Sequence, residues 1–117
     1  MKTTEAIMKG IYLKFYMHEN RKHNHMLVYE WLLMQAKKLD IHGGSVFRSI
    51  AGFGRHGVVH EDHCFELQGD LPVEVEFAVS DEEAQKLLKL IQAEKLTLFY
   101  VKQPIEYGVI NGEDAQA

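Results

Sequence analysis

The chain contains two stretches in which large apolar residues occupy every second position. The first runs from Ile11 to Met17 and the second from Val73 to Val79, and in both the odd-numbered residues are apolar. A period of two places alternate side chains on opposite faces of a β-strand. Each stretch therefore predicts a strand with one face in a hydrophobic core and the other open to solvent or to a partner.

Two other segments have the apolar spacing of helices. In segment 26–39, apolar side chains recur every three or four residues, which is typical of a helix with one buried face. Asn24 is predicted to cap this helix, and Ile-His-Gly-Gly at 41–44 is predicted to end it. The second helix is predicted to begin at Ser80, because glutamate at Glu83 completes a capping box.

Two shorter strand patterns, Ser45–Ala51 and Leu96–Val101, complete the set. The resulting order is strand, helix, strand, strand, helix, strand, with a long loop between the second and third strands. This order predicts an α+β fold, a ferredoxin-like βαββαβ sandwich in which two helices cover one face of a four-stranded antiparallel sheet. We interpret residues 1–117 as one domain, with a flexible arm at 1–8 and a tail at 104–117.

The second face of such a sheet carries aromatic side chains in this chain. Tyr12 and Tyr16, with Phe99 or Tyr100, would leave more aromatic surface exposed than a monomer usually shows. We therefore predict self-association, the alternative being that long charged side chains cover this face. Glutamates 74 and 76 are interpreted as a solvated or interface row rather than an acid/base pair.

Composition argues against several classes of protein. The net charge of −4 provides no broad basic surface for nucleic acid, and no apolar run approaches the roughly 20 residues of a membrane span. The first residues do not have the apolar core of a secretory leader. The single cysteine, Cys64, cannot form an internal disulfide, so we expect a reducing compartment and a cytoplasmic protein.

The second predicted strand leads into a Gly-Phe-Gly-Arg turn at 52–55. Glycine adopts φ values that other residues avoid and allows another molecule to approach the backbone. Arginine presents a rigid fork of donors suited to phosphate or carboxylate. We therefore predict an anion-binding site with these candidate ligand-binding residues: Gly52, Phe53, Gly54, Arg55, Arg48 and Arg21.

This turn, the order of elements and the Pro-Val-Glu-Val-Glu strand after a long loop resemble the PII-like signalling proteins. The likeness is greatest to the PII-like family DUF190 and extends from Ile11 to Val101. Its other matching pieces are Glu-Asn-Arg at 19–21, Leu-Val-Tyr-Glu at 27–30, Gly-Gly-Ser-Val at 43–46, Asp-Leu-Pro-Val at 70–73 and Ser-Asp-Glu-Glu at 80–83.

The resemblance implies a regulatory protein, a homo-oligomer and usually a trimer, with no enzymatic activity. Proteins of this kind bind nucleotides or other small effectors between subunits, so an adenine nucleotide is the candidate ligand here. The resemblance also implies that the loop at 53–71 contacts a partner protein, and membrane transport proteins such as fluoride exporters are the implied partners. Only the turn at 52–55 carries a functional role over residue by residue.

The chain departs from PII proteins proper in two places. Those proteins have a Thr-Gly-Arg-x-Gly-Asp-Gly-Lys segment after the second helix, where this chain has Gln-Ala-Glu-Lys at 92–95. The region of the loop tyrosine that is modified in some PII proteins reads His-Cys-Phe-Glu at 63–66. The resemblance therefore carries over neither the phosphate contacts of that segment nor control by uridylylation.

The long loop also supports a metal-binding alternative, because His56, His60, His63 and Cys64 are of types that bind transition metals. Their spacing matches no known finger or metalloprotease signature. Within the same loop, residues 58–60 and 64–67 are candidates for a small hairpin.

A further alternative is an assembly module without a ligand, whose sheet edge pairs with a partner. Catalysis by Cys64 with a histidine base lacks an orienting third group and an oxyanion element, so we expect no enzyme.

Overall fold

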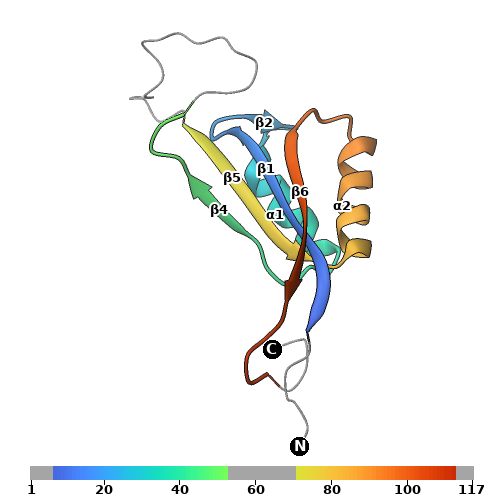
Figure 1. The fold of residues 1–117 in the computed structure, drawn as a ribbon. Helices are drawn as coiled ribbons and strands as arrows, with labels where there is room; N and C mark the ends of the chain where they lie inside the picture. The colour runs from blue at the N-terminus through green and yellow to red at the C-terminus, as the bar shows by residue number, and fades with distance from the viewer. Residues whose placement is uncertain (1–6, 53–70, 113–117) are drawn as a thin grey trace, which may run out of the picture.

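The computed structural model describes residues 7–52 and 71–112. Its main elements are β1 Met8–His18, α1 Val28–Lys38, β4 Ser45–Arg48, β5 Pro72–Val79, α2 Asp81–Ala93 and β6 Phe99–Tyr107. Four of them form one antiparallel sheet in the order β4-β5-β1-β6, and both helices cover the same face of it (Figure 1). This arrangement confirms the predicted ferredoxin-like α+β fold. No helix in the described ranges is long and apolar enough to cross a membrane.

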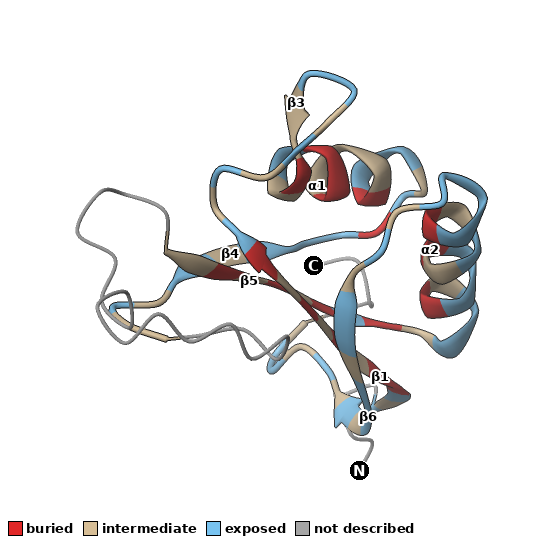
Figure 2. Cartoon of the chain, turned by 90° about the horizontal axis from the view of Figure 1, so that it is seen from above, coloured by how far each residue is buried: buried red, intermediate tan, exposed pale blue. Residues whose placement is uncertain are grey.

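The hydrophobic core lies between the sheet and the two helices, whose buried positions face the sheet (Figure 2). The central strands β1 and β5 supply its centre, because Leu13 pairs with Phe77 and Phe15 with Val75 across the sheet. All four side chains are at most 2% exposed. Burying a side chain of this size stabilises the fold by roughly 1.5–3 kcal/mol. The predicted alternation of both strands is confirmed, although β1 begins at Met8 rather than Ile11.

The start of α1 differs from the prediction. Leu27 occupies the N-cap position, and its side chain makes no capping hydrogen bond. Asn24 has a φ of 52° and lies between the short strands β2, Lys22–His23, and β3, Met26–Leu27. Asparagine tolerates this left-handed conformation better than most residues. Asn24 therefore turns a small hairpin instead of capping the helix, and the prediction of a cap was wrong.

The start of α2 agrees with the prediction. The Ser80 hydroxyl accepts a hydrogen bond from the Glu83 backbone N–H at 3.0 Å, and the Ser80 backbone N–H donates to the Glu83 carboxylate at 2.9 Å. These two bonds form a capping box, which satisfies two N–H groups that a helix start leaves without partners.

Replacing Ser80 with alanine removes the hydroxyl half of this box. We expect the free energy of unfolding to fall by about 1 kcal/mol, measured by urea titration followed by circular dichroism. Ser45→Ala is the matched control, because Ser45 is exposed on the edge strand β4, and its effect should stay within about 0.5 kcal/mol. Equal losses in the two variants would contradict a stabilising role for the cap.

The last strand lies further along the chain than predicted. β6 pairs with β1 from Phe99 to Tyr107, so it passes Pro104, where the tail was expected to begin. Proline is tolerated there because an edge strand has one side on which no neighbouring strand needs its N–H. Leu96 and Leu98, which were predicted to belong to the strand, pack against the core just before it.

Candidate functional site

The candidate site lies at the end of the sheet where β1 and β4 finish and β5 begins. Arg48 ends β4 opposite Val73, and His18 ends β1 opposite Pro72. The Ser49 backbone N–H donates to the Pro72 carbonyl at 2.9 Å, which continues the contact beyond β4. The strand predicted over 45–51 therefore ends earlier than expected, but its continuation remains attached to the sheet.

Glu19 links the three strands at this end. Its backbone N–H donates to the Leu71 carbonyl at 2.9 Å, and its Oε1 accepts from the Leu71 N–H at 3.4 Å. Its Oε2 accepts a hydrogen bond from Arg48 Nη2 at 2.8 Å. The Glu19 side chain is 14% exposed, whereas that of Arg48 is 64% exposed. The contact therefore orients the guanidinium and leaves most of it open to solvent.

This geometry allows Arg48 to receive a further anion. A guanidinium carries five N–H donors, and the contact with Glu19 is made through Nη2. The Arg48 side chain is 64% exposed, so its remaining donors are accessible from solvent. An incoming phosphate or carboxylate can therefore bind to Arg48 beside Glu19.

Arg21 belongs to the turn that carries Glu19. Its backbone N–H donates to the His18 carbonyl at 3.1 Å, and its carbonyl accepts from the Val28 N–H at 2.9 Å. The structure thus brings the turn with Arg21 and the end of β4 with Arg48 to the same end of the sheet, although the two arginines are far apart in the sequence.

Gly52 is the only member of the predicted Gly-Phe-Gly-Arg turn that lies within the described residues. Its φ is outside the left-handed region, and a Cβ added to it would meet Pro72 Cγ at 3.5 Å, an ordinary contact. The expectation that this position needs the conformational freedom of glycine is therefore wrong for Gly52. Gly52 lies after the end of β4 at Arg48, with residues 49–51 between them.

The other predicted site residues lie outside the described ranges. These are Phe53, Gly54 and Arg55 of the binding turn, the metal candidates His56, His60, His63 and Cys64, and the predicted hairpin at 58–60 and 64–67. Within residues 7–52 and 71–112, no group of three or more His, Cys, Asp or Glu side chains is arranged to hold a metal ion.

The segment after α2 makes a structural contact in this chain. Glu94 Oε1 lies 2.9 Å from His23 Nε2, which joins the end of α2 to the β2–β3 hairpin. The His23 ring also packs edge-on against Trp31 of α1, with 5.3 Å between ring centroids. Lys95 follows with a φ of 57° and ends the helix. PII proteins proper have a glycine-rich segment at this position. In this chain the segment instead connects the end of α2 to the β2–β3 hairpin through Glu94 and His23.

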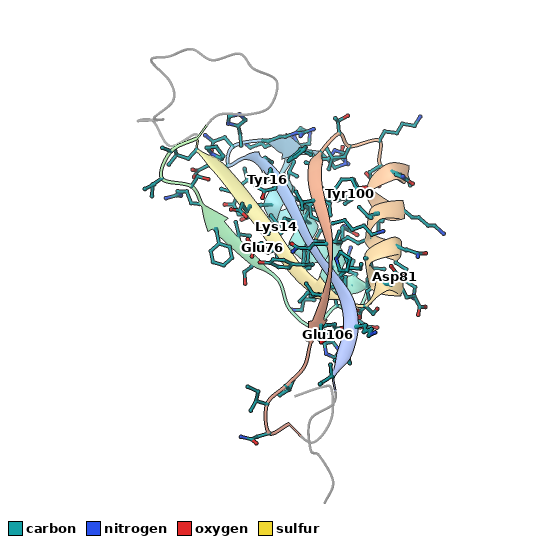
Figure 3. All side chains as sticks on the ribbon, viewed as in Figure 1. Lys14, Tyr16, Glu76, Asp81, Tyr100 and Glu106 are labelled. Atoms are coloured by element: carbon teal, nitrogen blue, oxygen red, sulfur yellow. The ribbon has the colours of Figure 1, made fainter. Side chains whose placement is uncertain are left out.

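The sheet face without helices forms a second candidate surface, which we call the open sheet face. Lys14, Tyr16 and Glu76 lie on it (Figure 3). Strand pairing also places Phe99 on this face, beside Tyr16 with ring centroids 5.5 Å apart, and Phe47 opposite Glu74. Its defining residues are Tyr12, Lys14, Tyr16, Phe47, Glu74, Glu76 and Phe99.

Exposed aromatic groups lie at both edges of the open sheet face. Phe47 is 53% exposed and Phe99 is 47% exposed. Tyr100 is on the helix-covered side, with its ring 6.1 Å from that of Phe15. Of the two residues considered from sequence, Phe99 is therefore the one on the open face.

Contacts on this face raise the pKa of two side chains, Tyr12 and Glu74. The Tyr12 hydroxyl donates to Glu76, and this bond, together with burial, raises the pKa of Tyr12 to about 12. Interaction with the neighbouring Glu76 carboxyl, followed by burial, raises the pKa of Glu74, while Lys14 acts in the opposite direction. The two glutamates interpreted from sequence as a solvated or interface row therefore interact with each other on this face.

Comparisons with known proteins agree with this fold. The profile of the family DUF190, described as "Uncharacterized ACR", matches residues 10–106. The UPF0166 protein of Aquifex aeolicus is 30% identical over 86 residues, which cover 74% of this chain and 82% of that protein. The UPF0166 protein MJ1524 of Methanocaldococcus jannaschii is 32% identical over 82 residues, which cover 70% of this chain and 75% of that protein.

Solved structures of PII-like proteins share the architecture. CPII of Thiomonas intermedia K12, solved with ADP, AMP and bicarbonate, aligns with a TM-score of 0.64 at 19% identity and covers 90% of this chain and 93% of CPII. The PII-like signalling protein TTHA0516 of Thermus thermophilus aligns with a TM-score of 0.58 at 16% identity and covers 86% and 90% of the two chains. The chain therefore belongs to DUF190, a family with the PII-like fold.

Proposed function

We propose that this chain is a PII-like regulatory protein that binds a small anionic effector at the end of β4. The observation that carries the proposal is Arg48, whose guanidinium is oriented by Glu19 and yet is 64% exposed. The proposed binding residues are Gly52, Phe53, Gly54 and Arg55 of the turn, with Arg48 and Arg21. Backbone N–H groups of glycine and the forks of arginine both suit phosphate oxygens.

The effector class that we propose is an adenine nucleotide, bound alone or with bicarbonate. Support comes from CPII, which has the same fold and was solved with ADP, AMP and bicarbonate. The contact of Arg48 with the Glu19 carboxylate supports only the anionic part of this ligand, because the guanidinium already pairs with an anion of the chain itself.

We further propose that the protein works as a homo-oligomer, a trimer in the manner of the PII-like proteins, with the effector between subunits. The open sheet face supports this part, because Phe47 and Phe99 leave aromatic surface that a second copy would cover. Residues 53–71 would then report the bound state to a partner protein, for which a membrane transport protein is the proposed class. Such signalling requires the partner to bind the two effector states differently.

Replacing Arg55 or Arg48 with alanine is expected to weaken effector binding by about 10- to 100-fold, because a charged hydrogen bond contributes about 1.5–3 kcal/mol. Isothermal calorimetry with ADP, AMP and bicarbonate, singly and combined, measures this change. Lys86→Ala on α2 is the control, since Lys86 is an exposed cation that pairs only weakly with Glu82 at 3.7 Å.

Glu19→Gln tests whether the negative charge of Glu19 competes with the effector for Arg48. The glutamine amide oxygen can still accept the hydrogen bond that orients Arg48, while the negative charge beside the effector is lost. Effector affinity should therefore stay equal or rise. The absence of binding heat and of thermal stabilisation with all three ligands would refute the adenine nucleotide and bicarbonate version of the proposal.

A further inference from the structure

The side chains of the open sheet face form rows that cross the four strands. On β6, β1, β5 and β4 in turn, one row consists of Phe99, Tyr16, Glu74 and Phe47. On the same strands, the next row consists of Val101, Lys14, Glu76 and Ser45. Lys14 and Glu76 lie side by side at the centre of the face (Figure 3). The acids are on β5 and the lysine is on β1, so each row differs in chemistry between its two halves.

Rows of this kind are complementary to themselves when their order is reversed. Half a turn of a second copy about an axis parallel to the strands places β1 of that copy on β5 of the first, and β6 on β4. Lys14 of each copy then faces Glu76 of the other, and Phe99 faces Phe47. Two sheets packed face to face keep their strands within about 30° of each other, so whole rows can meet.

The charges distinguish this orientation from the main alternative. An axis that crosses the strands would place β5 on β5 and bring the glutamates of both copies together, and like charges facing each other across an interface are costly. With the axis parallel to the strands, Glu76 instead meets Lys14 of the second copy. Glu76 accepts a hydrogen bond from the Tyr12 hydroxyl, and a carboxylate has about four acceptor positions. It can therefore accept from the ammonium of a second copy as well.

The aromatic rings favour the same orientation. Phe47 is 53% exposed at one edge of the face, and Phe99 is 47% exposed at the other. The ring of Phe99 lies beside that of Tyr16, with 5.5 Å between centroids. In the reversed orientation, Phe47 of each copy covers this aromatic pair in the other, which removes both exposed groups from water.

We propose that copies of this chain associate through the open sheet face about an axis parallel to the strands, with Phe47 of one copy against Phe99 of the next. This inference rests on the self-association proposed above and adds its orientation. The same rows meet in a pair of copies and in a ring of three, because rotation about such an axis keeps each row at its own height. Arg48 directly follows Phe47 on β4, so this contact lies beside the proposed effector site.

The test is disulfide cross-linking of the full chain carrying Ser45→Cys and Val101→Cys, with Cys64→Ser to remove the native thiol. Within one chain the two positions are three strands apart, about 14 Å at the usual strand spacing, whereas a disulfide needs Cα atoms within about 7 Å. A disulfide between the two positions therefore joins two copies. We expect mild oxidation to convert the chain into covalent dimers or trimers, and reduction to abolish them.

Ser45→Cys with Cys64→Ser is the matched control. With the proposed axis, position 45 of one copy lies far from position 45 of the next, so this variant should stay uncrosslinked. An axis across the strands would place β4 on β4 and cross-link it. A second measurement needs no variant: wild-type oligomers assembled from isotopically light and heavy chains are treated with a zero-length carbodiimide. We expect mixed-label peptides that join Lys14 to Glu74 or Glu76.

The possible failures are distinguishable. A wild type that stays monomeric in sedimentation velocity at all concentrations would refute the self-association itself. An oligomer without the 45–101 disulfide and without mixed-label peptides would refute only the orientation, as would efficient cross-linking of the control. Effector binding is measured separately by calorimetry, so its absence would leave this proposal standing.

Discussion

Phe77→Ala is expected to lower the free energy of unfolding by about 3–5 kcal/mol, through lost burial and the cavity left behind. Phe77 is 2% exposed, and its ring packs edge-on against Phe15, with 6.3 Å between centroids. Gly44 lies so close to the ring that an added Cβ would be 2.5 Å from it. Phe15 and the Gly44 backbone are packed closely against the ring, so they cannot easily move into the space that it would leave. Because domains are stable by only about 5–15 kcal/mol, urea titration should show a large fall in the midpoint.

Phe47→Ala is the matched control for this experiment. It removes the same side chain from the neighbouring strand, but Phe47 is 53% exposed on the open sheet face. Its effect on the dilute chain should stay within about 0.5 kcal/mol, while self-association should weaken. A loss of stability equal to that of Phe77→Ala would contradict the assignment of the core to the helix-covered face.

Gly10→Ala is expected to destabilise the chain by about 1–3 kcal/mol, because the position has no room for a methyl group. An added Cβ would lie within 3.0 Å of the Val79 carbonyl oxygen and of the Tyr107 ring. This carbonyl belongs to Val79, which pairs with Ile11 of β1, so it cannot move without disturbing the sheet. Thermal unfolding followed by circular dichroism should show the melting temperature falling by several degrees, since about 1 kcal/mol corresponds to roughly 4–8 °C in a small domain.

Gly43→Ala provides the comparison, since no atom lies within 4 Å of a Cβ added at Gly43. This variant should be neutral or slightly stabilised, because alanine restricts the unfolded chain. Similar melting temperatures for the two alanine variants would show that crowding at Gly10 is relieved by a small shift of the strands.

The sequence predicted the central elements well because their signals are local and strong. The alternation in β1 and β5 reflects one buried and one open face, and the pattern alone reveals which residues are inside. The capping box at Ser80 and Glu83 is likewise local, since both partners are three residues apart. These features require no knowledge of the rest of the chain.

The edges of the fold were harder to predict because distant partners decide them. β6 extends through Pro104 to Tyr107 because β1 offers a long pairing partner, whereas its own residues have no clear period. Asn24 is a good capping residue by type, but the β2–β3 hairpin uses its left-handed conformation instead. For β6 a distant strand decided the structure, whereas at Asn24 a local hairpin replaced the expected cap.

The sequence predicted only some of the residues and contacts of the candidate site. The sequence by itself indicated an anion-binding arginine near the end of the second strand and an aromatic second face of the sheet. It did not indicate that Glu19 accepts a hydrogen bond from Arg48 at 2.8 Å, or that the Tyr12 hydroxyl donates to Glu76. Those contacts connect residues that are far apart in the chain, so the order of strands in the sheet, and not any local pattern, brings their charges together.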